Sequence, residues 1–530
     1  MKSTFYTYLF FLPILLPCAY GQPQRSGEPI DFMTIVIEGK ENLYLPKSLI
    51  KHTPQLPPPY QQLELDSINP LEKVPLYRSE PIPNPDRIVE PSAQSAALRF
   101  SAGLYGFATL EGLYRTQLGA YVIDFNGILD RGGPYLANAD YFRTNFRLRG
   151  QAAWQQAPHA HFTTSTGIAN VETRSYRLFA LPSAPERMTR SLLLSLEHNG
   201  MLAASPYQVS MIAGTVRLQH ADTNTTEETE LAAHARIEPY RFNTITLGLL
   251  ADVSYRNYRT TPIHFHTLAA TGRYTDSTFT LSAHLGGQIA TTSFRTTTFA
   301  PLLELRSELA ITSFLCLDGR IASRMEPVRF RDLLALCPYI VDTAAIAVQM
   351  ATYHVAAGVT YLPRPEIQFR LEAGIQGFSE APFFESVADG TFALLYTEQT
   401  ERFVHLRGRY DIDRSNHLIA DLRLLDARFT DGKTVPYRPL LQTIVEYGHS
   451  MDEQFLASLR IGYVSPRHVS QQSEQTLRAY VVIAARAEYQ ISPSISVTAT
   501  LDNLAGSIIE LWRGYRERGS FVAIGAVVHF

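Results

Sequence analysis

Cysteine is almost absent from this chain of 530 residues, which contains only 3. One of them, Cys18, lies within an apolar N-terminal stretch, and Cys316 and Cys337 are the two that follow it. Two cysteines cannot form the disulfide framework of a small secreted domain. In an oxidising compartment they could form one disulfide at the foot of a long loop, or equally remain two unpaired small apolar residues. The fold must therefore be stabilised mainly by other interactions.

Long apolar runs and a dominant charge are also lacking. After the N-terminal stretch no run of about 18 apolar residues occurs, so we expect no transmembrane helix. The formal net charge of −3 is too small to indicate nucleic acid or an acidic substrate as a partner. No Gly-rich phosphate loop, Ser/His/Asp set or sheltered carboxylate pair stands out. We therefore expect neither an enzyme nor a bound cofactor.

The N-terminus has the pattern of an export signal. Met1 and Lys2 precede an apolar run over residues 5–16, and small residues, Ala19 and Gly21, follow at the −3 and −1 positions. This pattern predicts a secretory signal peptide over residues 1–21, cleaved after Gly21. A lipoprotein signal with Cys18 as the lipidated residue is the alternative, but the preceding Pro17 disfavours it.

Residues 22–94 differ in composition from the rest of the chain. Thirteen prolines fall between Pro23 and Pro91. Proline fixes φ and removes a backbone donor, so this segment is predicted to be extended and to lack a core of its own. We interpret it as a periplasmic or lumenal arm that precedes the folded part, residues 95–530.

From about Leu98 onward, apolar and polar residues alternate with the period of a β-strand. The polar faces of three segments carry the candidate lumen-lining residues, namely Arg143, Arg147, Arg149, Glu366, Arg370, Glu372, Arg407, Arg409 and Asp411. In a soluble sandwich such a face meets water, whereas in a membrane barrel the apolar face meets lipid and the charges line the lumen. Alternation alone fits both architectures.

Turn signals and aromatic content favour the membrane barrel. Short turns are predicted near Gln117, Pro158, Ala203, Tyr240, Asp276, Ser313, Arg364, Arg414, Ser450 and Pro493. Longer polar or Gly-rich stretches separate them, at 129–140, 171–186, 321–346, 379–400 and 465–476. Ten turns alternating with eleven loops correspond to about 22 antiparallel strands with both ends in the periplasm. The 56 Phe and Tyr residues suit the aromatic girdles of such a barrel.

The last ten residues, 521–530, form an apolar strand that ends on Phe530. Val522, Ile524, Ala526 and Val528 share one face with Phe530, and closing the sheet onto its first strand would pair the free edge. This ending resembles the C-terminal signal of bacterial outer-membrane β-barrels. The resemblance implies insertion into the Gram-negative outer membrane, with outer-membrane lipid and the barrel-assembly machinery as partners.

Longer motifs resemble TonB-dependent outer-membrane transporters. Near the C-terminus Asn503-Leu504 precedes Gly514-Tyr515, Gly519-Ser-Phe521 and the final strand, as in those receptors. Residues 31–39 are similar to their TonB box, which implies that Thr34, Ile35, Val36 and Ile37 bind TonB or another periplasmic protein by adding a strand to its sheet. The layout also resembles plugless, TonB-receptor-like barrels of the Bacteroidota.

A departure from these transporters concerns the plug that fills their lumen. Residues 22–94 are too few and too rich in proline for such a domain. The Pro-rich arm, the loops 321–346 and 379–400 folded inward, or a partner protein would therefore have to fill the barrel.

The predicted function is uptake or passage of an unidentified solute. The alternative is a structural scaffold of the outer membrane that anchors partner proteins through the arm. The arginine rows favour either an anion preference or an internal ion-pair network with neighbouring carboxylates. The pairs His159/His161 and His264/His266 have a spacing that can bind a metal, but neither has a further ligand, so no metal site is predicted.

Overall fold

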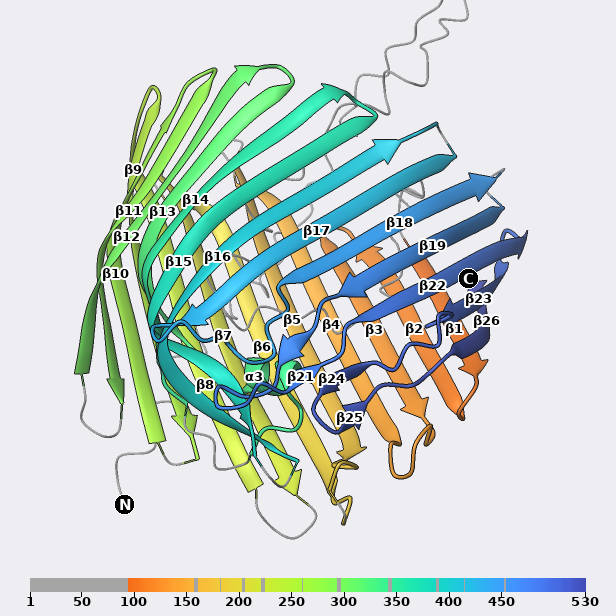
Figure 1. Ribbon diagram of the computed structural model, residues 1–530. Helices are drawn as coiled ribbons and strands as arrows, with labels where there is room; N and C mark the ends of the chain where they lie inside the picture. The colour runs from red at the N-terminus through yellow and green to blue at the C-terminus, as the bar shows by residue number, and fades with distance from the viewer. Residues whose placement is uncertain are drawn as a thin grey trace, which may run out of the picture. The chain divides into compact units, whose positions relative to one another are not determined.

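The computed structural model describes residues 94–530, apart from 157–160, 182, 203–204, 221–224, 260, 293–296, 342–345, 388–389, 414 and 452–453. Within these residues 22 strands form one antiparallel sheet that closes on itself (Figure 1). The predicted number of strands is confirmed. Four shorter strands form two separate pairs, and one short helix, α3, is present in the described part of the chain. No helix in the described part of the chain is both long and apolar enough to cross a membrane.

The strands follow one another around the barrel in chain order. The first half comprises β1 (Gln94–Gly103), β2 (Phe107–Leu118), β3 (Tyr121–Gly132), β4 (Tyr141–Gln156), β5 (His161–Arg177), β6 (Glu186–Leu202), β7 (Ser205–His220), β8 (Thr225–Phe242), β9 (Ile245–Tyr258), β10 (Thr261–Thr275) and β11 (Phe279–Thr292). The second half comprises β12 (Thr297–Thr312), β13 (Leu315–Pro327), β14 (Val348–Arg364), β15 (Ile367–Ser386), β16 (Phe392–Asp411), β17 (Asn416–Phe429), β18 (Leu441–Met451), β19 (Phe455–Val464), β22 (Tyr480–Ser492), β23 (Ile495–Asp502) and β26 (Phe521–His529). The remaining elements are α3 (Phe330–Leu336), β20 (Arg467–His468), β21 (Thr476–Leu477), β24 (Glu510–Trp512) and β25 (Tyr515–Arg516).

The last strand closes the barrel, as its sequence predicts. β26 pairs antiparallel with β1, with Leu98 opposite Val528 and Phe100 opposite Ala526. On its other side β26 pairs with β23. Closure leaves neither the first nor the last strand with an unpaired edge, which removes a template for aggregation.

The outer face of the barrel is apolar. On β6, Leu192, Leu194 and Leu196 lie on one face and remain exposed, with 45% of Leu194 accessible. On β26 the predicted outward residues Val522 and Ile524 are also exposed. So many large apolar side chains on a continuous surface would be unfavourable in water, whereas hydrocarbon accommodates them. The barrel therefore spans a membrane.

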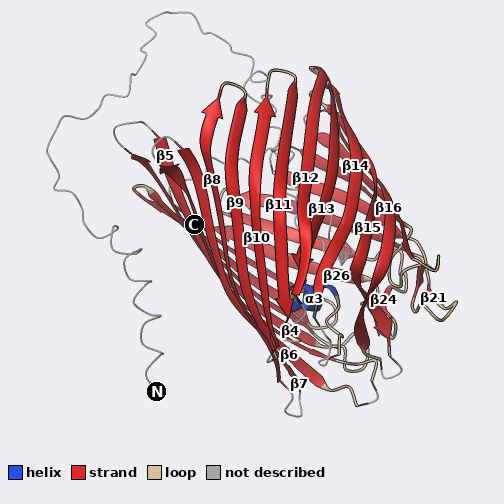
Figure 2. Cartoon of the chain, turned by 90° about the vertical axis from the view of Figure 1, so that its left-hand side faces the viewer, coloured by secondary structure: helices blue, strands red, loops and turns tan. Residues whose placement is uncertain are grey.

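The two ends of the barrel differ. The predicted turns fall within a few residues of connections at the end where β1 begins and β26 finishes, which we call the turn end. Three of them, at Pro158, Ala203 and Arg414, lie between consecutive strands but outside the described residues. Most of the longer connections, including 133–140, 178–185, 328–347, 430–440, 465–479 and 503–520, lie at the other end, the loop end. Figure 2 shows helix α3 among the loops at this end.

Candidate functional site: the lumen and the loop cap

Charged side chains on the inner face of the barrel pair across neighbouring strands. Arg99 lies 3.3 Å from Glu111, and Arg460 lies 2.5 Å from Glu446. Such contacts arise because residues opposite each other in an antiparallel pair share a face. In each pair the positive charge of the arginine offsets the negative charge of the glutamate. The inner wall of the barrel is therefore polar.

Glu304 is the centre of the densest of these networks. Its carboxylate lies 2.5 Å from Arg306 and 2.8 Å from Arg320, with His284 at 3.5 Å. The three partners come from β12, β13 and β11, so the network connects three consecutive strands. A buried carboxylate with several cationic partners holds this part of the wall rigid.

The predicted lumen residues of β4 differ in their partners. Arg143 donates to Glu172 at 2.8 Å. Arg147 is in register with Asn126 and Asn170, and Arg149 is in register with Asp124. Among the described residues, Arg147 and Arg149 have no ion-pair partner within 4.0 Å, and both are exposed. They add positive charge to this part of the barrel.

The predicted residues of β15 and β16 take part in the pairing. Arg370 lies 3.0 Å from Asp318 and 3.5 Å from Glu372, and it faces Arg407 in register. Arg407 in turn lies 3.1 Å from Asp421.

Three further residues of this set lie near the turn end. Arg409 pairs with Asp411 at 2.9 Å. Glu366 lies in the turn before β15, where it is exposed and its carbonyl accepts the N–H of Asp411. The role of all these residues in passage of a solute stays a prediction.

Other candidates lie elsewhere or beyond the described residues. Thr34, Ile35, Val36 and Ile37 fall outside the described residues, as do the signal peptide, the arm up to residue 93, and His159. His264 and His266 are exposed on β10, on the same face as Leu268. Within the described part of the chain, no group of three His, Cys, Asp or Glu residues could hold a metal ion.

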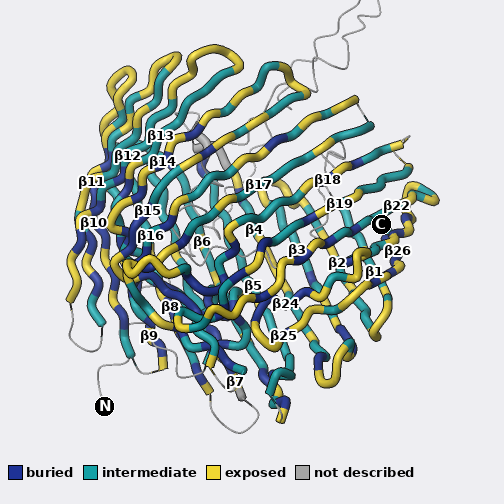
Figure 3. Tube along the Cα trace, in the orientation of Figure 1, coloured by how far each residue is buried: buried dark blue, intermediate teal, exposed yellow. Residues whose placement is uncertain are grey.

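A packed hydrophobic cluster, which we call the loop cap, lies at the loop end of the barrel. It consists of residues 178–181, 328–341, 437, 469–477 and 509–515, together with Phe384 and Phe392 from the β15–β16 hairpin. Figure 3 shows buried residues gathered where these connections meet. Of the two loops named as candidates for filling the lumen, 321–346 contributes residues 328–341 to the loop cap, whereas most of 379–400 belongs to β15 and β16.

Helix α3 contributes one apolar face to the loop cap. Phe330, Leu333 and Leu334 are buried at the spacing of a helical face, and Cys337 is buried directly after the helix. Cys337 and Cys316 are both free thiols, and Cys316 lies on β13 near the turn end. Burial raises the pKa of the Cys337 thiol.

Aromatic rings connect the segments of the loop cap. The rings of Tyr339 and Tyr515 stack with centroids 3.5 Å apart. Trp512 contacts Tyr437 at 4.7 Å, Phe392 at 5.0 Å and Phe384 at 5.1 Å between centroids. Aromatic pairs of this kind are worth about 0.5–1.5 kcal/mol each beyond the area that they bury. The cap is therefore one packed unit.

Three buried arginines attach the loop cap to the barrel and to itself. Arg187 of β6 donates to the carbonyl of Ile340 at 2.6 Å, and Arg256 of β9 donates to that of Val328 at 2.8 Å. Arg467 donates to the carbonyl of Glu510 at 2.7 Å. These side chains are only 1–2% exposed. Buried cations are costly unless their donors are paired, so these bonds restrict where the cap can lie.

Two glutamates of β8 complete the attachment. Glu228 accepts the backbone N–H of Phe330 at 3.0 Å. Glu230 pairs with Arg329 at 2.9 Å and with Arg256 at 3.2 Å. Burial lowers the pKa of Arg329, but Glu230 and Asp332 outweigh that effect and leave the pKa above its ordinary value. The ion pair therefore stays charged at physiological pH.

Comparisons with known proteins identify the fold. No protein-family model matches the chain, and no curated protein matches it in sequence. Solved structures do match. The FrpB iron transporter from Neisseria meningitidis is 9% identical, with a TM-score of 0.67 over 83% of this chain and 82% of its own. The copper transporter OprC is 10% identical, with a TM-score of 0.64 over 82% of this chain and 80% of its own.

A third structure is the ferric enterobactin receptor PfeA from Pseudomonas aeruginosa. It is 11% identical, with a TM-score of 0.62 over 83% of this chain and 82% of its own. The barrel has the fold of TonB-dependent receptors. The resemblance seen in the sequence is thereby confirmed at the level of the fold. Because closed barrels with an even number of strands and an apolar exterior are typical of bacterial outer membranes, the chain is an outer-membrane protein.

The anchors of the loop cap have no signature in the sequence. Arg187 occupies an inward position of an alternating strand, as many other arginines of this chain do. The apolar residues of 330–337 were the one sequence signal for the loop cap. Phe330, Leu333 and Leu334 would lie on one face of a helix, and such an apolar face is unfavourable in a loop exposed to solvent.

Proposed function

We propose that this protein is an outer-membrane transporter of the TonB-dependent-receptor type, which takes up a solute through its barrel. The observation that carries the proposal is the match of the whole barrel to proteins that transport copper or iron or bind ferric enterobactin, over at least four-fifths of each chain. The charged inner wall supports it, since such a lumen suits a polar solute.

The loop cap supports a gated passage. A barrel of 22 strands is wide, and an unfilled lumen would leak. The cap lies at the loop end, which faces the exterior if the turns are periplasmic, as in other outer-membrane barrels. A solute then enters the lumen when the cap separates from its anchors.

We further propose that the arm provides the coupling to the periplasm. After cleavage at Gly21, residues 22–94 form the periplasmic or lumenal arm in this scheme, and residues 95–530 form the barrel. Thr34, Ile35, Val36 and Ile37 then pair with the sheet edge of TonB, since an apolar, β-prone segment binds by strand addition. The barrel-assembly machinery acts earlier, during insertion. A plugless barrel is part of the same proposal.

Conductance in planar lipid bilayers tests the transport proposal. We expect the wild-type protein to be nearly silent and the variant Arg187→Met, which loses a cap anchor, to show discrete current steps. The matched control is Arg190→Met on the opposite face of β6, which should remain silent. If neither variant conducts although both are folded, and the protein co-purifies with other envelope proteins, the scaffold alternative replaces the transporter.

Binding of the TonB C-terminal domain tests the coupling separately. The purified protein should bind it, and the double substitution Ile35→Pro and Ile37→Pro should abolish binding, because proline removes backbone donors from the added strand. Binding that survives this double substitution rules out the segment but leaves transport untouched.

A further inference from the structure

The outer face of β14 to β17 carries a groove whose floor is the backbone of one row of residues. Ala356, Gly374, Phe403 and Leu425 are successive register partners across the four strands. On each strand the residues directly before and after this row form the sides of the groove. Because neighbours in a strand point to the opposite face, the side residues point away from the lumen. Exposed Val355 and Leu424 agree with this direction.

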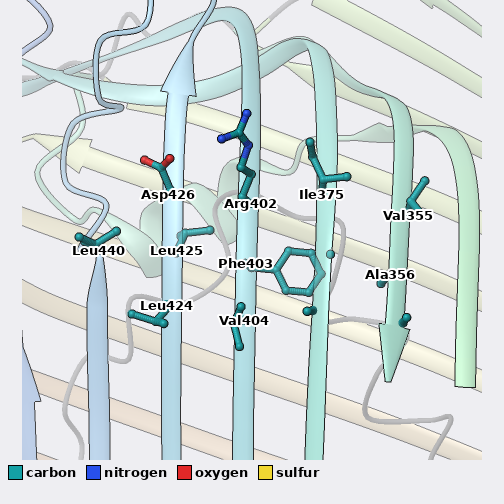
Figure 4. A pocket seen from close by; sticks show the side chains of 13 residues that line it. Val355, Ala356, Ile375, Arg402, Phe403, Val404, Leu424, Leu425, Asp426 and Leu440 are labelled. Atoms are coloured by element: carbon teal, nitrogen blue, oxygen red, sulfur yellow. The ribbon is translucent and has the colours of Figure 1, made fainter. Parts of the chain in front are cut away.

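Two small residues account for the depth of the groove. Ala357 and Ala373 lie opposite each other in register, and both belong to the outward set. Their methyl groups leave room beside the larger Val404 and Leu424, and the groove encloses about 690 Å³. Figure 4 shows Val404 and Leu424 on adjacent strands, with Arg402 and Asp426 beyond them toward one end.

The side of the groove that contains Arg402 and Asp426 coincides with the edge of the apolar belt. On the outer face of β16, Leu406 and Val404 are followed toward the loop end by Arg402 and Thr400. On β17, Leu422 and Leu424 are followed by Asp426 and Arg428. Both strands change from apolar to polar at the same level, because Arg402 and Asp426 are register partners. One side of the groove therefore lies at the membrane–water boundary, and the other side lies in the apolar region.

The charge at this boundary is positive. Asp426 is already paired with Arg428 at 2.8 Å. Arg402 is exposed and, among the described residues, has no carboxylate at ion-pair distance. The three side chains thus carry one net positive charge, held by a guanidinium group that suits the planar oxygens of a phosphate.

We propose that this groove is a binding site for lipid A, the phosphorylated glycolipid of the outer leaflet. One acyl chain lies along the floor against Ala357 and Ala373, and a sugar phosphate is bound by Arg402. The loop end faces the exterior in an outer-membrane barrel, so the leaflet at the level of Arg402 is the outer one. A lipid bound here would stabilise β14 to β17, the strands nearest the β15–β16 hairpin that enters the loop cap.

The test measures lipid A retained by the full-length protein purified in mild detergent from a Gram-negative host. Native mass spectrometry gives the number of bound lipids, and analysis of 3-hydroxy acyl chains identifies lipid A. We expect the wild-type protein to retain it in a ratio near one. Ala373→Phe, which fills the groove, should lose most of it, whereas Ala233→Phe, at an exposed outward alanine on β8, should not.

Arg402→Gln tests the head group separately from the tail, because it removes the charge and leaves Ala357 and Ala373 in place. Loss of this charge-assisted hydrogen bond should lower the retention of lipid A roughly ten- to a hundred-fold. Resistance to unfolding in SDS at room temperature checks that each variant is folded. Equal retention by wild type and Ala373→Phe overturns the proposal. So does a wild-type protein that carries a glycerophospholipid in place of lipid A.

Discussion

Tyr339 and Tyr515 stack face to face in the loop cap, with ring centroids 3.5 Å apart and planes inclined by 13°. Tyr339 belongs to the connection between β13 and β14, and Tyr515 belongs to the connection between β23 and β26. Burial raises the pKa of Tyr339 well above its ordinary value, so the stacked ring stays neutral. Because the two connections cover each other's apolar surface, we expect the cap to open as a unit.

Substitution of the buried arginine of β6 should loosen this unit. In Arg187→Met the buried carbonyl of Ile340 loses its side-chain donor, and the carbonyl of Pro338 keeps only the hydroxyl of Tyr176. Leaving such groups unpaired costs about 1–3 kcal/mol, which corresponds to amide exchange in residues 333–341 that is roughly ten to a hundred times faster. Hydrogen–deuterium exchange with mass spectrometry measures this change.

The matched control is Arg190→Met. Arg190 lies on the opposite face of the same strand, in register with Arg217, and does not reach the cap. An equal rise in exchange in both variants would mean that β6 itself, rather than the cap anchor, had been destabilised.

The thiol of Cys337 should report on the state of the cap. It is completely buried, and burial raises its pKa, whereas only the thiolate form reacts rapidly with maleimides. In a Cys316→Ser background Cys337 is the only cysteine after residue 21. We expect slow labelling at pH 8 in this background and fast labelling once Arg187→Met is added. Rapid labelling without that substitution would contradict a closed cap.

The same thiol predicts a pH dependence for the cap. A group whose pKa is raised by folding stabilises the folded state fully below its ordinary pKa, here 9.0, and loses that contribution as the pH rises further. Exchange of residues 333–341 should therefore accelerate above pH 9 in the wild type. Cys337→Ala should remove this part of the acceleration, and an unchanged profile in that variant would assign it to another group.

Asp413 predicts a change at low pH in the turn between β16 and β17. Its carboxylate accepts the side-chain amide of Asn416 at 2.7 Å and the backbone N–H of Ser415 at 2.7 Å. These bonds lower its pKa below the ordinary value of 3.8. A carboxylate whose pKa is lowered by folding stabilises the folded state above its ordinary pKa, and this contribution is lost as the pH falls. Protection of the backbone amide of Asn416, which also donates to Asp413, should therefore decrease below pH 3.8.

The variant Asp413→Asn checks this assignment. An amide oxygen still accepts a hydrogen bond but does not titrate in this range, so the pH dependence of the Asn416 amide should disappear. NMR-detected exchange at pH 3 and pH 6 gives the comparison. If the dependence persists in Asp413→Asn, another carboxylate controls the turn.

The barrel could be predicted from the sequence because its signals are local. Period-two alternation marks each strand, and turn residues mark each hairpin, so the number of strands and the outward face of Val522 and Ile524 followed directly. The end of a strand is less well defined. Alternation continues through Glu366, whereas the structure begins β15 at Ile367.

The loop cap and the outer groove depend on contacts that the sequence does not encode locally. Arg187 and Ile340 are far apart in the chain, and their hydrogen bond exists only once the seven intervening strands, β7 to β13, have formed the wall. The groove likewise depends on register, since Ala357 and Ala373 make a depression only because they lie opposite each other. A one-residue register shift of either strand would turn its alanine from the outer face to the lumen.

The arginines of β4 provide a test of how the lumen selects ions. Arg147 and Arg149 are exposed, and within the described residues they have no ion-pair partner, so they raise the local concentration of anions. In the cap-loosened Arg187→Met protein, the double substitution Arg147→Gln and Arg149→Gln should shift the reversal potential in a KCl gradient toward cation preference. The same substitution at outward Arg190 should not. The shift should shrink as salt rises, because the Debye length falls from about 10 Å at 0.1 M to about 3 Å at 1 M. A reversal potential that is identical with and without these two arginines would show that they do not face the conducting path.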